Sequence, residues 1–131
     1  MWACPHCREA LQLDAAGAAW VCVNGHQFDC AREGYVNLLP ANRKRSRHPG
    51  DSPEMMAARR RVHQAQLYLP LAEAIEALLA SLEPMATLLD LGCGEGDYCG
   101  GLQRARPEAH LCGSAIAKTA VRQASKQQPQ G

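Results

Sequence analysis

The clearest hydrophobic pattern in the chain has a helical period and lies between two prolines. Apolar residues recur there at spacings of three and four, at Leu71, Ala74, Ile75, Leu78, Leu79 and Leu82. This spacing predicts an amphipathic helix that begins at Pro70 and ends before Pro84.

A second, weaker helical pattern precedes it. Ser52 and Pro53 have the residue types of an N-cap and a first-turn proline. Apolar residues then mark one helix face, at Met55, Ala58, Val62 and Ala65. We therefore expect a helix from residue 53 onward.

A strand-like pattern follows the two helices. Residues 86–91 form a short apolar run, which is typical of a strand buried on both faces. A glycine-rich turn, a helix over 97–105, a strand over 109–113 and a polar helix over 116–126 are expected next. This order predicts the start of a parallel α/β sheet, of which only two strands are present.

The first third of the chain has a different pattern, because residues 1–38 are rich in Cys, Gly and aromatic residues and lack a long helical period. Pro40, a basic cluster and the Pro49-Gly50-Asp51 turn interrupt any periodic element between 40 and 52. We therefore predict a small module at 1–38, a linker at 39–52 and the beginning of a larger domain at 53–131.

Two pairs of potential metal ligands lie in the small module. Cys4 and Cys7 form a C-x2-C pair, and Cys22 and His26 form a C-x3-H pair after a spacer of 14 residues. Two such pairs can converge on one tetrahedral Zn²⁺, and four protein ligands make the site structural. Cys30 is the second choice for the fourth ligand, and His6 is expected to point away from the ion.

Cysteine usage and hydropathy indicate a cellular compartment. The seven cysteines are odd in number, and no export signal precedes them, which favours reduced thiols over a disulfide framework. No run of about 18 apolar residues predicts a membrane-spanning helix. We expect a cytoplasmic protein with no membrane association.

Positive charge is concentrated in one segment, although the net charge of the chain is only +1. Half of the 14 basic residues lie between positions 43 and 61, at Arg43, Lys44, Arg45, Arg47, Arg59, Arg60 and Arg61. Such a run is by itself most often a solvated linker or helix face. Next to a zinc module it favours contact with nucleic-acid phosphates.

The turn after the first strand has the pattern D-x-G-x-G-x-G, formed by Asp90, Gly92, Gly94 and Gly96, with Glu95 inside it. Glycines let the backbone approach a ligand closely at the carboxyl end of a strand. No G-K-[ST] follows, and the carboxylates would repel a pyrophosphate, so a cationic ligand is favoured. The pattern resembles motif I of the Rossmann-like methyltransferases, which borders the amino-acid part of S-adenosylmethionine.

The whole chain resembles the bacterial 23S rRNA guanine-N1 methyltransferases of the RlmA type. The similarity runs from Cys4 to about Lys126, and its most specific parts are GHQFD at 25–29, REGYVNLLP at 32–40, KRSR at 44–47, PGDS at 49–52 and EMMAARR at 54–60. The resemblance implies an α/β fold with a zinc module followed by an incomplete Rossmann-like domain. It also implies methylation of guanine N1 in a 23S rRNA hairpin loop with S-adenosylmethionine, and it leaves a homodimer open.

The resemblance assigns site residues position by position. The matched zinc ligands are Cys4, Cys7, Cys22 and His26, and the matched cofactor positions are Tyr68, Gly94 and Glu95, with Asp90, Gly92 and Gly96 completing the turn. The residues expected at the RNA are Arg43, Lys44, Arg45, Arg47, Arg59 and Arg60. No catalytic residue is assigned.

The sequence departs from the family in two ways. Ala115 stands where the family has an acidic residue, and the chain ends where later strands would begin. We therefore expect this chain to be inactive by itself. The alternative functions are a zinc-dependent RNA-binding module with a vestigial methyltransferase start, and a methyltransferase that acts on small molecules.

Overall fold

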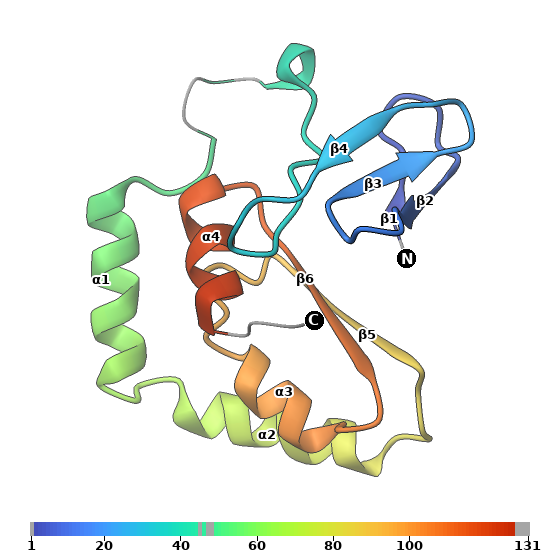
Figure 1. The fold of residues 1–131 in the computed structure, drawn as a ribbon. Coiled ribbons are helices and arrows are strands. Elements are labelled where there is room, and N and C mark those ends of the chain that lie inside the picture. The colour runs from blue at the N-terminus through green and yellow to red at the C-terminus, as the bar shows by residue number, and fades with distance from the viewer. Residues whose placement is uncertain (1, 45, 47–48, 128–131) are drawn as a thin grey trace.

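The computed structural model describes residues 2–44, 46 and 49–127, and its N-terminal part is a small antiparallel sheet (Figure 1). Four short strands pair in sequence order: β1 (Trp2–Ala3), β2 (Ala10–Leu13), β3 (Ala19–Cys22) and β4 (Gln27–Asp29). The β2–β3 register places Leu11 opposite Cys22, and both side chains are buried. This register brings one of the predicted metal ligands into the small apolar core.

The second part of the chain contains helices around a two-stranded parallel sheet. The elements are α1 (Pro53–Gln64), α2 (Leu69–Ser81), β5 (Thr87–Leu91), α3 (Cys99–Ala105), β6 (His110–Ser114) and α4 (Lys118–Gln127). β5 and β6 pair in parallel, with α3 as the connection between them. The predicted order of helices and strands is confirmed, with bounds shifted by one or two residues.

One face of the parallel sheet is covered by α2 and α3, which pack against each other (Figure 1). The core on this side contains buried Cys93, Cys99, Leu102 and Leu111, with Ile75, Leu79, Leu88, Tyr98 and Ala115 packed against it. A helix layer over β5-α3-β6 is the packing expected for an α/β unit. This core positions the glycine turn that leaves β5.

The prediction that β5 is buried on both faces is wrong for this chain. Leu88 packs against the core, whereas Leu89 and Leu91 point to the opposite face and are 52% and 82% exposed. The reason is that successive strand residues alternate between faces, and α2 and α3 cover only one of them. An apolar run shows that both faces can be buried, but not that a second layer is present.

The helix faces also differ in part from the predicted ones. In α1 the buried residue is Met56, which joins Ala117 and Ala120, whereas Met55 is 53% exposed. Of the face predicted for α2, only Ile75 and Leu79 pack on the core, while Leu71, Leu78 and Leu82 are exposed. Each helix buries mainly the residues that face its partner, which is α4 for α1 and α3 for α2. Fewer residues are therefore buried on each helix than the sequence periodicity predicts.

The segment between β4 and α1 ends in the predicted helix cap. A 3-10 turn occupies Ala41–Arg43, and Ser52 accepts a hydrogen bond from the Met55 amide at 3.3 Å. An ion pair between Glu33 and Arg122 at 2.7 Å joins the end of the first part to α4. Among the described helices, none combines the length and apolar character needed to cross a membrane.

Candidate functional site

The four predicted metal ligands come from two tight turns at the same end of the small sheet. Cys4 follows β1, and the chain turns there with the Arg8 amide bonded to the Cys4 carbonyl at 2.8 Å. Cys22 ends β3, and the Gly25 amide donates to its carbonyl at 2.9 Å. Gly25 has a φ of +78°, which favours glycine and allows His26 to turn back toward Cys22.

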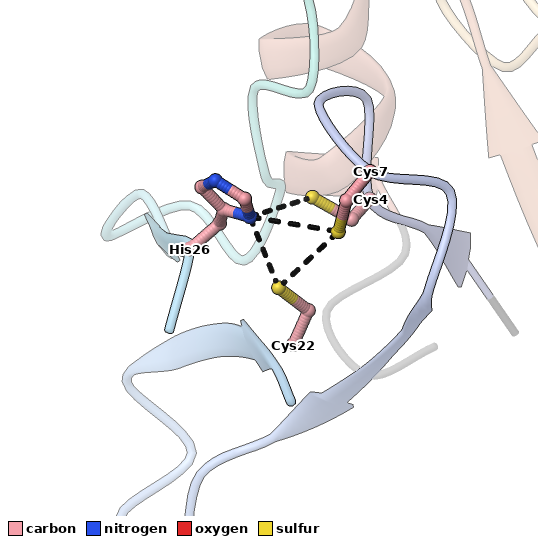
Figure 2. Close-up of side chains that lie close together, drawn as sticks. All are labelled: Cys4, Cys7, Cys22 and His26. Carbon is pink, nitrogen blue, oxygen red and sulfur yellow. Dashed lines mark hydrogen bonds between the residues drawn. The ribbon is translucent and has the colours of Figure 1, made fainter. Parts of the chain in front are cut away.

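The side chains of Cys4, Cys7, Cys22 and His26 converge on one point, as Figure 2 shows, with their ligand atoms all within 4.8 Å of one another. The three Sγ atoms lie 3.6, 3.5 and 3.3 Å from Nδ1 of His26, and the Sγ atoms of Cys7 and Cys22 are 3.8 Å apart. A single ring nitrogen takes part in one strong hydrogen bond, so hydrogen bonding does not explain three sulfurs around it.

A tetrahedral zinc ion explains this arrangement. Bond lengths of about 2.3 Å to sulfur and about 2.0 to 2.1 Å to nitrogen give edges of roughly 3.8 Å between sulfurs and roughly 3.6 Å between sulfur and nitrogen. The observed distances match these edges closely. The residues therefore fit a structural Zn²⁺ with four protein ligands and no open position.

The two alternative ligands stand apart from this cluster. Cys30 is not among the converging residues and lies beside Val36 in an isolated β-bridge. His6 points toward the aromatic residues, with its ring stacked on Phe28 at a centroid distance of 5.8 Å and tilted against His26 at 5.1 Å. Of the residues that the structure describes, only the first-choice set of four can hold the ion.

The electrostatics of the cluster differ between its thiols. A hydrogen bond from the Asn24 side chain is the main cause that lowers the pKa of Cys7 to about 6. Burial raises the pKa of Cys22. Zinc binds cysteine as the thiolate, so Cys22 is expected to lose its proton when a metal binds.

The glycine turn after β5 requires backbone conformations that favour glycine. Gly92, Gly94 and Gly96 have φ values of +87°, +57° and +85°. The amides of Gly92 and Cys93 both donate to the Ser114 carbonyl, at 2.7 and 2.9 Å, and this fixes the turn to the end of β6. The turn therefore lies at the carboxyl end of the two parallel strands, where α/β proteins bind ligands.

A pocket of about 570 Å³ lies beside this turn. Its walls come from α1, the start of α2, the glycine turn and α4, and they include Arg60, His63, Tyr68, Glu95, Asp97 and Tyr98. The predicted cofactor residues Tyr68 and Glu95, which lie in different elements, thus line the same pocket. The volume is in the usual range for a small-molecule site, roughly 300 to 1,000 Å³.

Asp90 does not line this pocket, although the sequence groups it with Glu95. It lines a smaller cavity of about 250 Å³ with apolar residues of β5, α2 and α3. Burial raises the pKa of Asp90, and the Cys99 thiol lies 3.8 Å from its carboxylate. Of Asp90 and Glu95, only Glu95 therefore lines the larger pocket.

Sequence reasoning missed most of the pocket residues, among them His63, Asp97 and Tyr98. His63 Nε2 lies 3.5 Å from the Asp97 carboxylate, and its ring contacts Tyr68 and Tyr98 with centroids 5.6 Å away in each case. The spacing of Arg60 and His63, three residues apart on α1, could have indicated a shared helix face. What that face contacts was not visible in the sequence.

The residues predicted to contact RNA have different surroundings. Arg43 and Lys44 are exposed, Arg59 pairs with Asp51 at 2.7 Å, and Arg60 pairs with Glu95 inside the pocket. Arg45 and Arg47 lie outside the described residues.

The expected acidic residue at the end of β6 is also replaced in the structure. Ala115 stands at this position and packs against the core, so it offers no carboxylate to a ligand.

Comparison with known proteins agrees with these features. Residues 2–47 match the family model described as RlmA, N-terminal, a zinc ribbon. The chain is 33% identical over 96% of its length to the 23S rRNA (guanine(748)-N(1))-methyltransferase of Streptomyces fradiae. It is 36% and 34% identical, again over 96% of its length, to proteins of Micromonospora griseorubida and Bacillus subtilis that are provisionally named 23S rRNA (guanine-N(1)-)-methyltransferases.

The fold and the four-ligand cluster define a zinc-ribbon protein that continues into a methyltransferase-like α/β region. Its N-terminal part matches the zinc ribbon of the RlmA-type proteins, and nearly all of its length is similar to 23S rRNA guanine-N1 methyltransferases. It spans about half the length of these relatives, between 44% and 48%.

Proposed function

We propose that this chain provides the zinc-binding and cofactor-binding part of an S-adenosylmethionine-dependent methyltransferase that acts on guanine N1 in a 23S rRNA hairpin loop. The observation that carries this proposal is the pocket beside the glycine turn, where Tyr68 and Glu95 meet. The relatives named as rRNA guanine-N1 methyltransferases support the reaction and the substrate. They do not favour a purely RNA-binding role.

The pocket residues fit the chemistry of the cofactor. Tyr68 and Tyr98 offer aromatic faces to a positively charged ligand, and Glu95 and Asp97 offer carboxylates. When bound, S-adenosylmethionine supplies the electrophilic methyl group. The role of this chain would be to orient the ligand, because correct placement of reactants supplies much of the acceleration in such transfers.

One departure predicts weak cofactor binding. In dinucleotide sites a carboxylate about 20 residues beyond the glycine turn holds the ribose hydroxyls, and here the end of β6 has Ala115 instead. Losing hydrogen bonds to a charged group costs about 1.5 to 3 kcal/mol, or about tenfold or more in affinity. We therefore expect a dissociation constant well above that of a site with the acid.

Contact with RNA would use the exposed basic residues between the zinc ribbon and α1. Arg43 and Lys44 are exposed there, and positive side chains bind phosphates without sequence preference. The target guanine would have to leave its stack, at a cost of a few kcal/mol that is smallest in an unpaired loop. An rRNA substrate would place the protein in the cytoplasm, and a homodimer stays a prediction for sedimentation analysis.

Calorimetry with S-adenosylmethionine tests the cofactor assignment. We expect saturable heat with the unaltered chain and a loss of affinity of about tenfold or more in Glu95→Gln and Tyr68→Ala. Glu73→Gln is the matched control, because Glu73 is exposed on α2 and outside the pocket. No heat at millimolar ligand with the unaltered chain would reject the cofactor assignment.

A salt titration of binding to a 23S rRNA hairpin tests the RNA assignment. The affinity should fall as salt rises, and Arg43→Ala combined with Lys44→Ala should make the slope less steep by about one to two. Lys126→Ala, an exposed residue near the end of α4, is the control. An affinity that does not depend on salt would reject the RNA assignment and favour a small-molecule substrate.

A further inference from the structure

We propose that Arg60 belongs to the ligand pocket and binds the carboxylate of the amino-acid part of S-adenosylmethionine, instead of contacting RNA. The inference rests on the proposed function of the pocket. Sequence reasoning placed Arg60 with the RNA-binding residues because it lies in a basic run. The structure places its guanidinium against Glu95 in the pocket wall.

The contact between Arg60 and Glu95 uses two hydrogen bonds. Nε of Arg60 donates to Oε2 of Glu95 at 3.1 Å, and Nη2 donates to Oε1 at 2.5 Å. The Glu95 side chain is 8% exposed, whereas that of Arg60 is 48% exposed. A buried carboxylate that loses its cation is strongly unfavourable, so Arg60 is expected to stay on Glu95 when a ligand enters.

The paired guanidinium keeps donors for a second carboxylate. Arginine has five N–H groups, and the two bonds to Glu95 use the Nε and Nη2 edge. The edge formed by Nη1 and Nη2 remains, and no other described residue pairs with it. Since Arg60 lines the pocket and is half exposed, this edge is available for the bidentate geometry in which arginine binds carboxylates.

The charges in the pocket then suit a zwitterion. Glu95 is neutralised by Arg60, and Asp97 lies 3.5 Å from His63 at the same pocket. The amino-acid part of the cofactor carries one ammonium and one carboxylate, which can face Asp97 and Arg60 respectively. The sequence favoured a cationic ligand because the cation facing Glu95 was not visible in it.

The same geometry makes Arg60 a poor phosphate contact. Its guanidinium lies in the pocket wall against Glu95, and a pocket ligand that uses the free edge would leave no pair of donors for a phosphate. Its neighbour Arg61 is exposed and lies outside the pocket. Arg61 therefore serves as a matched control for the loss of one positive charge on α1.

The test compares two ligands in calorimetry with the full 131-residue chain. One is S-adenosylmethionine, and the other is its decarboxylated analogue, which keeps the adenosine, the sulfonium and the amine. We expect the unaltered chain and Arg61→Ala to prefer S-adenosylmethionine by about 10- to 100-fold. Arg60→Gln should lower this preference to about onefold, and Arg60→Lys should leave an intermediate value, because lysine keeps the charge but loses the fork.

Folding defects are separated from recognition by the ratio of the two affinities. A disturbed pocket would weaken both ligands equally, whereas loss of a carboxylate contact weakens only one. If Arg60→Gln alone is unstable because Glu95 is left buried without a cation, the double variant Arg60→Gln with Glu95→Gln removes that charge. The preference should be lost in the double variant and kept in Glu95→Gln.

Three results would overturn the assignment of Arg60 while leaving the pocket intact. The Arg60→Gln variant could retain the preference for S-adenosylmethionine, or the unaltered chain could lack this preference. Alternatively, Arg60→Gln could bind S-adenosylmethionine more tightly, which would make Arg60 a competing cation. If the unaltered chain binds neither ligand, the cofactor assignment itself fails, and the role of Arg60 fails with it.

Discussion

Removing the metal should unfold the zinc ribbon and leave the helices in place. Among the described residues of the first 44, Leu11 is the only large aliphatic side chain that is buried, at 5% exposure. Burying one such side chain contributes about 1.5 to 3 kcal/mol, and ordering each backbone residue costs about 1 to 2 kcal/mol. Structural zinc in small modules contributes about 10 to 16 kcal/mol, so the metal decides whether this part folds.

Tryptophan fluorescence reports on the zinc ribbon alone. The chain has two tryptophans, Trp2 and Trp20, and both pack against the cluster formed by Cys4, Leu11 and Cys22. A chelator, or the substitution Cys22→Ser, should therefore shift the emission to longer wavelength. The circular dichroism of α1 to α4 should change little, because these helices lie in residues 53–127.

The control and the metal content complete this test. Elemental analysis should return one zinc per chain for the unaltered protein and for Cys30→Ser, since Cys30 lies outside the cluster. Cys22→Ser should hold no zinc after gel filtration. Unchanged tryptophan emission in metal-free protein, or full zinc content in Cys22→Ser, would refute the idea that the ion holds this part together.

Three further results are expected. Gly50→Ala should destabilise the chain by about 2 to 5 kcal/mol in urea denaturation, because φ is +92° and the new Cβ would lie 2.6 Å from the Cβ of Ala117. The control Gly17→Ala, with φ +68° and no neighbouring atom within 4 Å of the new Cβ, should cost only about 1 to 2 kcal/mol. Equal losses of stability in the two variants would disprove the clash. Ser52→Ala should lose about 1 kcal/mol of stability in thermal denaturation, because the helix cap is removed, whereas Ser52→Asp should keep the cap. An equal loss of stability in both variants would exclude capping as the cause. Burial raises the pKa of Cys99 to about 12, so its reactive thiolate is scarce at pH 8. Alkylation followed by mass spectrometry should therefore label Cys99 only after unfolding. Rapid labelling of Cys99 in the folded protein would contradict this burial.

Features that depend on short stretches of chain could be predicted from the sequence. The four zinc ligands were found because each pair lies within one tight turn, where spacing largely sets the geometry. The helices, the two parallel strands and the glycine turn were likewise visible, since period, caps and glycine positions are local properties. The same holds for the Ser52 cap.

Features that depend on contacts between distant segments were decided only by the tertiary structure. Arg60 and Glu95 are 35 residues apart in the chain, and the packing of α1 beside the glycine turn brings them together. Asp90 and Glu95 are close in sequence but face different cavities, because the strand and the turn direct them differently. Hydrophobic periodicity states which residues can be buried, whereas the partner that covers each face determines which of them are.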